Sequence, residues 1–200
     1  MMRLADEFTV SAAPDRAYAW LLDLRRVAPC VPGGEIREPD PDGVYPGRVS
    51  VKLGPMKFVY DGRVRITDRD PVARTAVIEG EGRASGGADT AKVRTLMEVL
   101  PEGDGSRVRV TTDLDIKGRA AQMGQGVISD VSRRLLGQAA ACIEAHLSAP
   151  EGADAASLPT AGEVGGIGLV ASVMGAKVGD SVRRLGSWKR GNDNKPEEGA

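Results

Sequence analysis

The sequence predicts an α+β fold in which an antiparallel curved sheet wraps around a long C-terminal helix, followed by a flexible tail. Two changes of hydrophobic period support this prediction. From Glu35 to Lys117 apolar residues alternate with polar ones, as in antiparallel strands that have one face toward water. From Arg119 to Leu147 apolar residues recur at helical spacing. A chain of 200 residues is long enough for one such domain and a tail.

The N-terminal residues predict a strand followed by a helix. Arg3 to Ser11 alternates apolar and polar side chains, which is typical of a strand. Pro14 and Asp15 then favour a helix start, because the fixed φ of proline and an acidic side chain both suit the first turn. The apolar residues that follow at helical spacing are Ala17, Trp20, Leu21 and Leu24. The run Pro32-Gly33-Gly34 ends the helical region.

The alternating region divides into strands separated by turn sequences rich in Gly, Pro and Asp. The predicted strands are Arg48 to Leu53, Lys57 to Thr67, Thr75 to Ala84, Thr90 to Leu100 and Arg107 to Lys117. We expect them to form a meander of hairpins. The acids Asp61, Glu79 and Glu81 could be offered for proton transfer, but charged residues are common on the solvent-facing side of such strands.

The last predicted element of the domain is one helix of about 29 residues, long enough to cross a sheet. Its apolar stripe consists of Ala120, Met123, Val127, Val131, Leu135, Ala139, Cys142 and His146. Small residues occur on both sides of the expected interface between sheet and helix. They are Gly62, Gly80, Gly82 and Ala84 on the strands, and Gly124, Gly126 and Gly137 on the helix. These residues would leave volume for a ligand, although close backbone packing explains them equally well.

Beyond the domain, expected at residues 1–148, the composition changes twice. Residues 149–163 are expected to form a flexible linker, and residues 191–200 a disordered tail. Between them, residues 164–190 form an amphipathic segment that binds a membrane or a partner protein. The residues expected to bind are Ile167, Val170, Met174, Val178, Arg183, Arg184, Leu185 and Trp188. The apolar run at 165–176 is too short to span a bilayer, which needs roughly 20 residues.

Two other interpretations of this segment remain open. Gly175 and Gly179 would let a helix of another protein approach closely. The segment could also fold back as an extra helix on the domain. Its many glycines favour the membrane, because a helix that is poor in water forms only where its apolar face is buried.

Composition argues against several classes of function. Lys and Arg number 27 against 28 Asp and Glu, so the chain lacks the basic field of a nucleic-acid-binding protein. Cys30 and Cys142 are far apart in sequence and His146 is the single histidine, which leaves zinc sites, thiol pairs and Ser/His/Asp catalysis short of parts. We expect no metal and no catalytic residue. No secretory signal is visible at the N-terminus, and we expect a cytoplasmic protein.

Three sequence stretches resemble the CoxG-like family of carbon monoxide dehydrogenase accessory proteins, which belongs to the START-like helix-grip superfamily. They are VPGGE at Val31 to Glu35, VKLGPMKFVYDGRVRITDRD at Val51 to Asp70, and TTDLDIKGRAAQMGQGVISDVSRRLLGQAAACIE at Thr111 to Glu144. The resemblance covers about Met2 to Leu147. The family usually reads VPGCE, whereas here Gly34 fills the cysteine position and the cysteine stands earlier, at Cys30.

The resemblance implies a non-catalytic accessory protein that recruits an aerobic molybdenum carbon monoxide dehydrogenase, or a related molybdenum hydroxylase, to the inner face of the cytoplasmic membrane. It also implies an apolar cavity between sheet and long helix, with a respiratory quinone, menaquinone or ubiquinone, as bound ligand and no covalent cofactor. Strand parity and helix spacing select the candidate cavity residues Trp20, Phe58, Tyr60, Val64, Val93, Met97, Met123, Val127 and Val131. The alternatives are a recruitment scaffold whose core is filled by side chains, and a small cavity enzyme of the same fold, such as an aromatase or cyclase.

The amphipathic segment generates the first testable prediction. Removing residues 164–200, or substituting Met174→Asp, is expected to abolish association with anionic vesicles, because either change removes or charges the apolar face. Flotation of the full chain and both variants measures the association, and circular dichroism checks that the domain stays folded. Vesicle binding that both variants retain contradicts the prediction.

Overall fold

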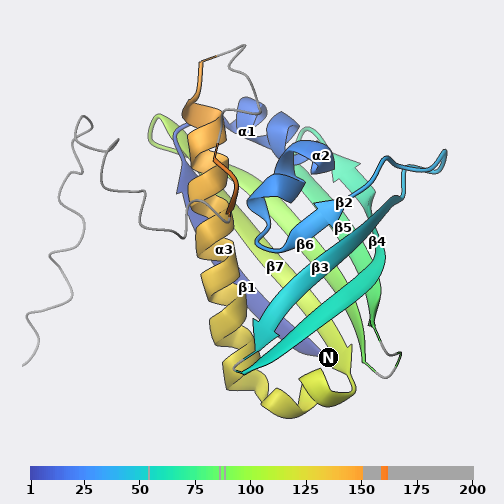
Figure 1. The fold of residues 1–200 in the computed structure, drawn as a ribbon. Coiled ribbons are helices and arrows are strands. Elements are labelled where there is room, and N and C mark those ends of the chain that lie inside the picture. The colour runs from blue at the N-terminus through green and yellow to red at the C-terminus, as the bar shows by residue number, and fades with distance from the viewer. Residues whose placement is uncertain (54, 86, 88, 151–158, 162–200) are drawn as a thin grey trace, which may run out of the picture. The chain divides into compact units, whose positions relative to one another are not determined.

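The computed structural model describes residues 1–53, 55–85, 87, 89–150 and 159–161. Within them a seven-stranded antiparallel sheet has the order β1-β7-β6-β5-β4-β3-β2 (Figure 1). The strands are β1 Met2–Val10, β2 Gly34–Ile36, β3 Tyr45–Leu53, β4 Met56–Asp70, β5 Thr75–Ala84, β6 Thr90–Glu102 and β7 Gly105–Lys117. The first strand therefore pairs with the last one, and the strands between them form a meander.

Helices cover one face and one end of this sheet. They are α1 Pro14–Leu21, α2 Leu24–Val27, η1 Ala28–Cys30, η2 Arg119–Met123 and α3 Gln125–Ser148, where η marks a 3-10 helix. The long helix α3 lies along the concave face and contacts β1 and β3, near the two edges of the sheet (Figure 1). The predicted α+β class and the wrapping of a curved sheet around a C-terminal helix are confirmed.

The predicted strands all occur, and most of them are longer than the alternating pattern indicated. Glycine allows the sheet to bend in its middle. A Cβ at Gly62 would collide with the backbone of Glu81 and Gly82 on the neighbouring strand, so this position requires glycine. A shift of register between Ile66 and Asp68 adds a bulge to the same strand.

The prediction of one helix from Arg119 to Leu147 is wrong at its start. Gly124 has φ +82°, which a right-handed helix does not allow, and it separates η2 from α3. The break resets the phase of the helix. Ile128 therefore takes the buried position, with 5% of its surface exposed, whereas Val127 is 39% exposed.

The helix glycines also differ from expectation. A Cβ at Gly126 or Gly137 would meet no atom within 4 Å, and both residues are exposed. They lie on the solvent side of α3 and leave no volume at the interface. The glycines that do lie on the concave face are Gly62, Gly80 and Gly82, on β4 and β5.

The apolar core is divided into two clusters at opposite ends of the concave face. The α1-end cluster contains Val10, Ala12, Ala17, Tyr18, Leu21, Cys30, Ala76, Met97, Val99, Val108, Ala139, Cys142, Ile143 and Leu147. The η2-end cluster contains Leu53, Phe58, Tyr60, Ala84 and Ala120. Two polar bonds tie α1 and its preceding loop to the sheet: the Tyr18 hydroxyl donates to the Thr75 carbonyl at 2.9 Å, and the Ser106 hydroxyl donates to the Ala12 carbonyl at 2.6 Å.

The C-terminal predictions are only partly within reach of the structure. The amphipathic segment 164–190 and the tail 191–200 lie outside the described residues. Within the expected linker, Pro159–Ala161 lies against α3, and Ala161 is only 2% exposed. Among the described residues, no helix combines the length and the apolar character needed to cross a membrane.

The reset phase of α3 predicts unequal effects at two adjacent positions. Ile128→Ala is expected to lower the free energy of unfolding by about 2 to 4 kcal/mol, because it leaves a void in packed surroundings. Val127→Ala is expected to change it by less than about 0.5 kcal/mol, as at other exposed positions. Urea unfolding of both variants measures the difference, and equal losses would restore the unbroken helix.

Candidate functional site

The middle of the concave face lies between the two core clusters and is not filled by either. Its residues are Asp6 on β1, Gly62 and Val64 on β4, Gly80 and Gly82 on β5, Val93 and Thr95 on β6, and Thr112 and Leu114 on β7. Each of them keeps partial exposure although it faces α3. We call these residues the middle belt. A partly accessible belt between two buried clusters is the pattern of a hollow that a ligand can occupy.

The middle belt carries polar groups as well as apolar ones. Thr95 and Thr112 lie opposite each other on β6 and β7, and their hydroxyl oxygens are 2.9 Å apart, within hydrogen-bond distance. Asp6 lies 4.0 Å from Arg133 of α3, from carboxylate oxygen to guanidinium nitrogen. These groups can bond to polar atoms of a ligand that is otherwise held by apolar contacts.

Tyr60 borders the middle belt from the η2-end cluster. Its ring stacks on Phe58 with centroids 6.4 Å apart. Burial raises the pKa of the Tyr60 phenol, and the negative charge of Asp89 raises it further. The phenol therefore stays protonated at neutral pH and remains a hydrogen-bond donor.

A surface groove of about 290 Å³ opens at the η2 end of the molecule. It is lined by Met1, Met2, Leu114, Ile116, Ala121, Gln125 and Ile128. These residues come from the start of β1, the end of β7, η2 and the start of α3. Since Leu114 also belongs to the middle belt, the groove and the hollow meet at this side chain.

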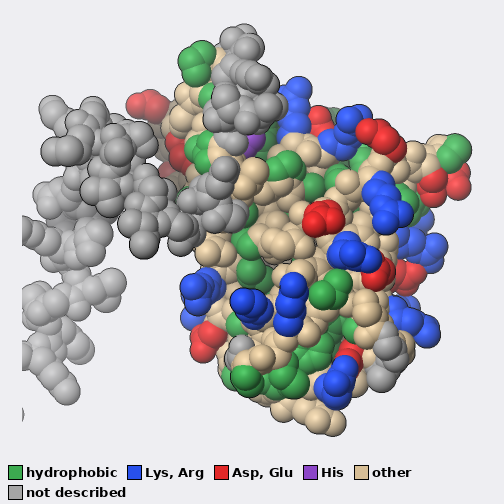
Figure 2. Space-filling model, in the orientation of Figure 1, with side chains coloured by type: hydrophobic (Ala, Val, Ile, Leu, Met, Phe, Trp, Pro, Cys, Tyr) green, Lys and Arg blue, Asp and Glu red, His purple; other side chains and the backbone are tan. Residues whose placement is uncertain are grey.

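Hydrophobic side chains are also exposed at the η2 end. Figure 2 shows them gathered at the lower end of the molecule, where Figure 1 places η2 and the turn between β3 and β4. The partly buried apolar residues that pack on the η2-end cluster are Val49, Val51, Met56, Ala91, Ile116, Met123 and Val131. This end is thus both less tightly packed and more apolar on its surface than a closed core would be.

Asp89 holds the corner at which β7 turns into η2. Its carboxylate is 1% exposed and accepts hydrogen bonds from the backbone N–H groups of Arg119 and Ala120. The Arg119 guanidinium lies 3.3 Å from the same carboxylate. The sequence analysis did not select Asp89, because a single acid in a Gly-rich turn carries no pattern.

The acids weighed for proton transfer lie on the opposite, solvent-facing side of the sheet. Asp61 pairs with Arg48 at 2.7 Å, and this hydrogen bond lowers the pKa of the Asp61 carboxyl. Glu81 pairs with Arg63, which lowers the pKa of the Glu81 carboxyl in the same way. Both acids are ionised partners in cross-strand pairs and face away from the hollow.

The structure distributes the predicted cavity residues over three regions. Phe58 and Tyr60 belong to the η2-end cluster, and Met123 and Val131 pack on it. Val64 and Val93 lie in the middle belt, whereas Met97 and Trp20 belong to or pack on the α1-end cluster. Val127 is misassigned, for the reason given by Gly124. The groove residues Leu114, Ile116 and Ile128 were missed, although strand parity places the first two on the concave face.

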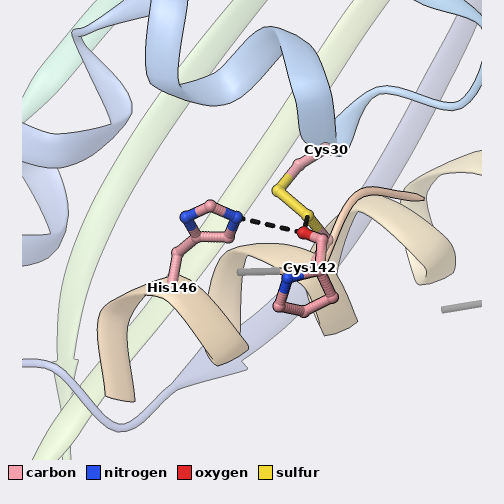
Figure 3. Close-up of a disulfide and its surroundings, with 4 residues drawn as sticks. Cys30, Cys142 and His146 are labelled. Atoms are coloured by element: carbon pink, nitrogen blue, oxygen red, sulfur yellow. Dashed lines mark hydrogen bonds between the residues drawn. A yellow bond between two sulfur atoms is a disulfide. The ribbon is translucent and has the colours of Figure 1, made fainter. Parts of the chain in front are cut away.

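The expectation that the two cysteines stay apart is wrong. Cys30 and Cys142 form a disulfide that joins η1 to α3 across 112 positions of sequence (Figure 3). His146 lies one helical turn after Cys142, and its Nε2 donates to the Pro159 carbonyl at 3.1 Å. Its ring also lies 5.7 Å from that of Trp20. Sequence separation hid this cluster, because only the packing of α3 on η1 brings the residues together.

Comparison with known proteins agrees with this architecture. The family model of the carbon monoxide dehydrogenase accessory protein CoxG matches residues 7–148. The chain belongs to the CoxG family. A search of curated proteins finds no match to this CoxG family member.

Solved structures show that the fold of this CoxG family member is the helix grip. A conserved protein from Geobacillus kaustophilus is 15% identical with a TM-score of 0.65, covering 74% of this chain and 95% of its own. The aromatase/cyclase Zhui from Streptomyces sp. R1128 is 16% identical with a TM-score of 0.52, covering 73% of this chain and 93% of its own. At such identities the likeness concerns the fold alone.

The corner at Asp89 generates a testable prediction. Asp89→Ala is expected to destabilise the domain by about 1 to 3 kcal/mol, because the buried N–H groups at the start of η2 lose their acceptor. Asp104→Ala, in the exposed turn between β6 and β7, is the control and is expected to change little. Thermal or urea unfolding compares the two variants. Equal stability of Asp89→Ala and the unmodified chain would mean that other groups hold the corner.

Proposed function

We propose that this CoxG family member is a non-catalytic accessory protein of a molybdenum carbon monoxide dehydrogenase or related molybdenum hydroxylase. It binds a lipophilic respiratory quinone, menaquinone or ubiquinone, between the sheet and α3, and it recruits the enzyme to the cytoplasmic membrane. Membership of the family supports the association with the dehydrogenase. The accessible middle belt supports the ligand.

A quinone matches the chemistry of the hollow. Its ring and isoprenoid chain are apolar, and burying them releases roughly 25 cal/mol per Å². Its carbonyl oxygens are acceptors, which the protonated Tyr60 phenol and the hydroxyls of Thr95 and Thr112 can satisfy. In this proposal the ring lies in the middle belt near Tyr60.

The groove at the η2 end gives the isoprenoid chain a way out of the hollow. Ile116 and Ile128 line it with apolar surface, and Leu114 connects it to the middle belt. The opposite end is closed by the α1-end cluster and the disulfide. A long chain therefore enters and leaves at the η2 end, which would face the bilayer during exchange.

Two alternatives give different results in the same experiment. A recruitment scaffold without ligand would leave the hollow to water. A cavity enzyme would use the fold as the Zhui aromatase/cyclase does, but that likeness concerns the fold alone. Among the described residues, the acids of the central strands named above face solvent as ion pairs, which gives the enzyme hypothesis little support.

Occupation of the hollow can be tested with two substitutions on one strand. Val93→Phe extends a ring into the middle belt and is expected to lower quinone content at least tenfold, because the ring takes the space of the ligand. Leu96→Phe adds the same ring on the outer face of β6, where Leu96 is exposed, and is expected to leave quinone content unchanged. Native mass spectrometry and organic extraction of chains from a respiring host measure the content.

Each outcome decides between the candidates. A stoichiometric quinone in the unmodified chain that Val93→Phe loses and Leu96→Phe keeps establishes the carrier. A chain that carries no quinone, or one that Val93→Phe retains fully, overturns the proposed cavity. Membrane association of a quinone-free chain would then leave the recruitment scaffold.

A further inference from the structure

The three side chains best suited to bind a thiophilic metal ion meet at one point. The chain has two cysteines and one histidine among 200 residues, and their ligand atoms all lie within 4.8 Å of one another. Neither the sheet pattern nor the hollow requires this meeting. We propose that Cys30, Cys142 and His146 form a redox-gated metal site, which is closed as the disulfide and binds one Zn²⁺ when both sulfurs are reduced.

The elements place the three ligands on a rigid frame. Cys142 and His146 are four residues apart on α3, so their side chains project from one face of the helix. Cys30 is the last residue of η1 and reaches the same face from the other side, with 5.4 Å between the two cysteine Cα atoms. Both cysteines are fully buried and His146 is half-buried. Such a frame fixes ligand geometry before the ion arrives.

The ligand set and the spacing suit zinc. Two thiolates and an imidazole are common zinc ligands, and a site with three protein ligands keeps a fourth position for water or another oxygen. Zn–S bonds of about 2.3 Å put two thiolate sulfurs about 3.8 Å apart in a tetrahedral site. Breaking the disulfide and rotating the cysteine side chains supplies this separation without moving either helix far.

Pro159 provides a second observation at the same place. Its carbonyl oxygen lies 3.1 Å from His146 Nε2 and 3.2 Å from Cys142 Sγ (Figure 3). In the disulfide state the sulfur has no hydrogen, so the imidazole N–H is the donor to this carbonyl. In the dithiol state the Cys142 thiol can donate to the same oxygen. The carbonyl thus satisfies the cluster before the ion binds, or offers the fourth ligand after it.

The chemistry balances with two reactants of named class. A small dithiol supplies two electrons and two protons, the S–S bond breaks, and the reductant becomes a disulfide. Zn²⁺ then displaces the two thiol protons. The imidazole proton moves to Nδ1, so that Nε2 gives up its hydrogen bond to Pro159 and binds the ion.

Zinc binding by the full chain in its two redox states tests the proposal. The chain is purified as the disulfide, or reduced with dithiothreitol, which is then removed, and mass spectrometry distinguishes them by two hydrogens. Titration with Zn²⁺ against a chromophoric chelator is expected to give one site per chain in the reduced state and none in the disulfide state. Titration with Co²⁺ is expected to show thiolate-to-cobalt charge-transfer absorption only in the reduced state.

Variants separate a built site from adventitious thiol binding. His146→Ala keeps both cysteines and is expected to weaken zinc binding by about tenfold or more, since it removes one of three ligands. Ser148→Ala on the same helix is the matched control and is expected to bind as the unmodified chain does. Cys30→Ser removes the disulfide together with a ligand and is expected to abolish tight binding, with circular dichroism checking its fold.

Three results would overturn the site. The first is a reduced and folded chain that does not bind zinc. The second is an affinity that His146→Ala leaves unchanged, which would mean that the thiols bind the ion without the imidazole. The third is a disulfide that the dithiol fails to reduce in the folded chain, which would make it a permanent staple. None of these results bears on quinone binding.

Discussion

The packing of the C-terminal half of α3 is the constraint on which the rest of the structure depends. Ala139, Cys142, Ile143 and Leu147 enter the same buried cluster as Val10 and Val108 of the edge pair β1 and β7. A curved sheet leaves its concave face exposed unless a helix covers it, and burial of these side chains supplies the free energy that holds the helix there. Because the helix is fixed at this end, its other half can stand over the middle belt without filling it.

Uneven packing along α3 gives the two ends of the domain different roles. The α1 end is closed by apolar packing, by the bonds from Tyr18 and Ser106, and by the disulfide. The η2 end depends on a smaller cluster and on the capped corner at Asp89. Local stability follows local packing, so opening at the η2 end costs less than opening at the α1 end. A ligand exchanged through the groove would leave the anchored half of the helix in place.

The disulfide and the hollow are connected through the same helix. Cys142 lies in the anchored half, and His146 follows one turn later toward the covering segment Pro159–Ala161. A change in the state of the sulfurs acts on the end of α3 that is already rigid, so it changes the anchor and not the entrance. The proposed zinc site and the proposed quinone site are therefore separate in space and in chemistry.

The sequence by itself determined the class of this protein. Alternation over the strands and helical spacing after Arg119 follow from backbone geometry alone, and they predicted the curved sheet and the long helix. Tertiary structure decided three things that no local pattern carries. The φ of Gly124 set the phase of α3, so that Ile128 and not Val127 is buried. The hollow arises because side chains from five strands leave a space between them, which depends on their distance from α3. Cys30, Cys142 and His146 meet only because α3 packs on η1, since contact between distant residues is a property of the assembled fold.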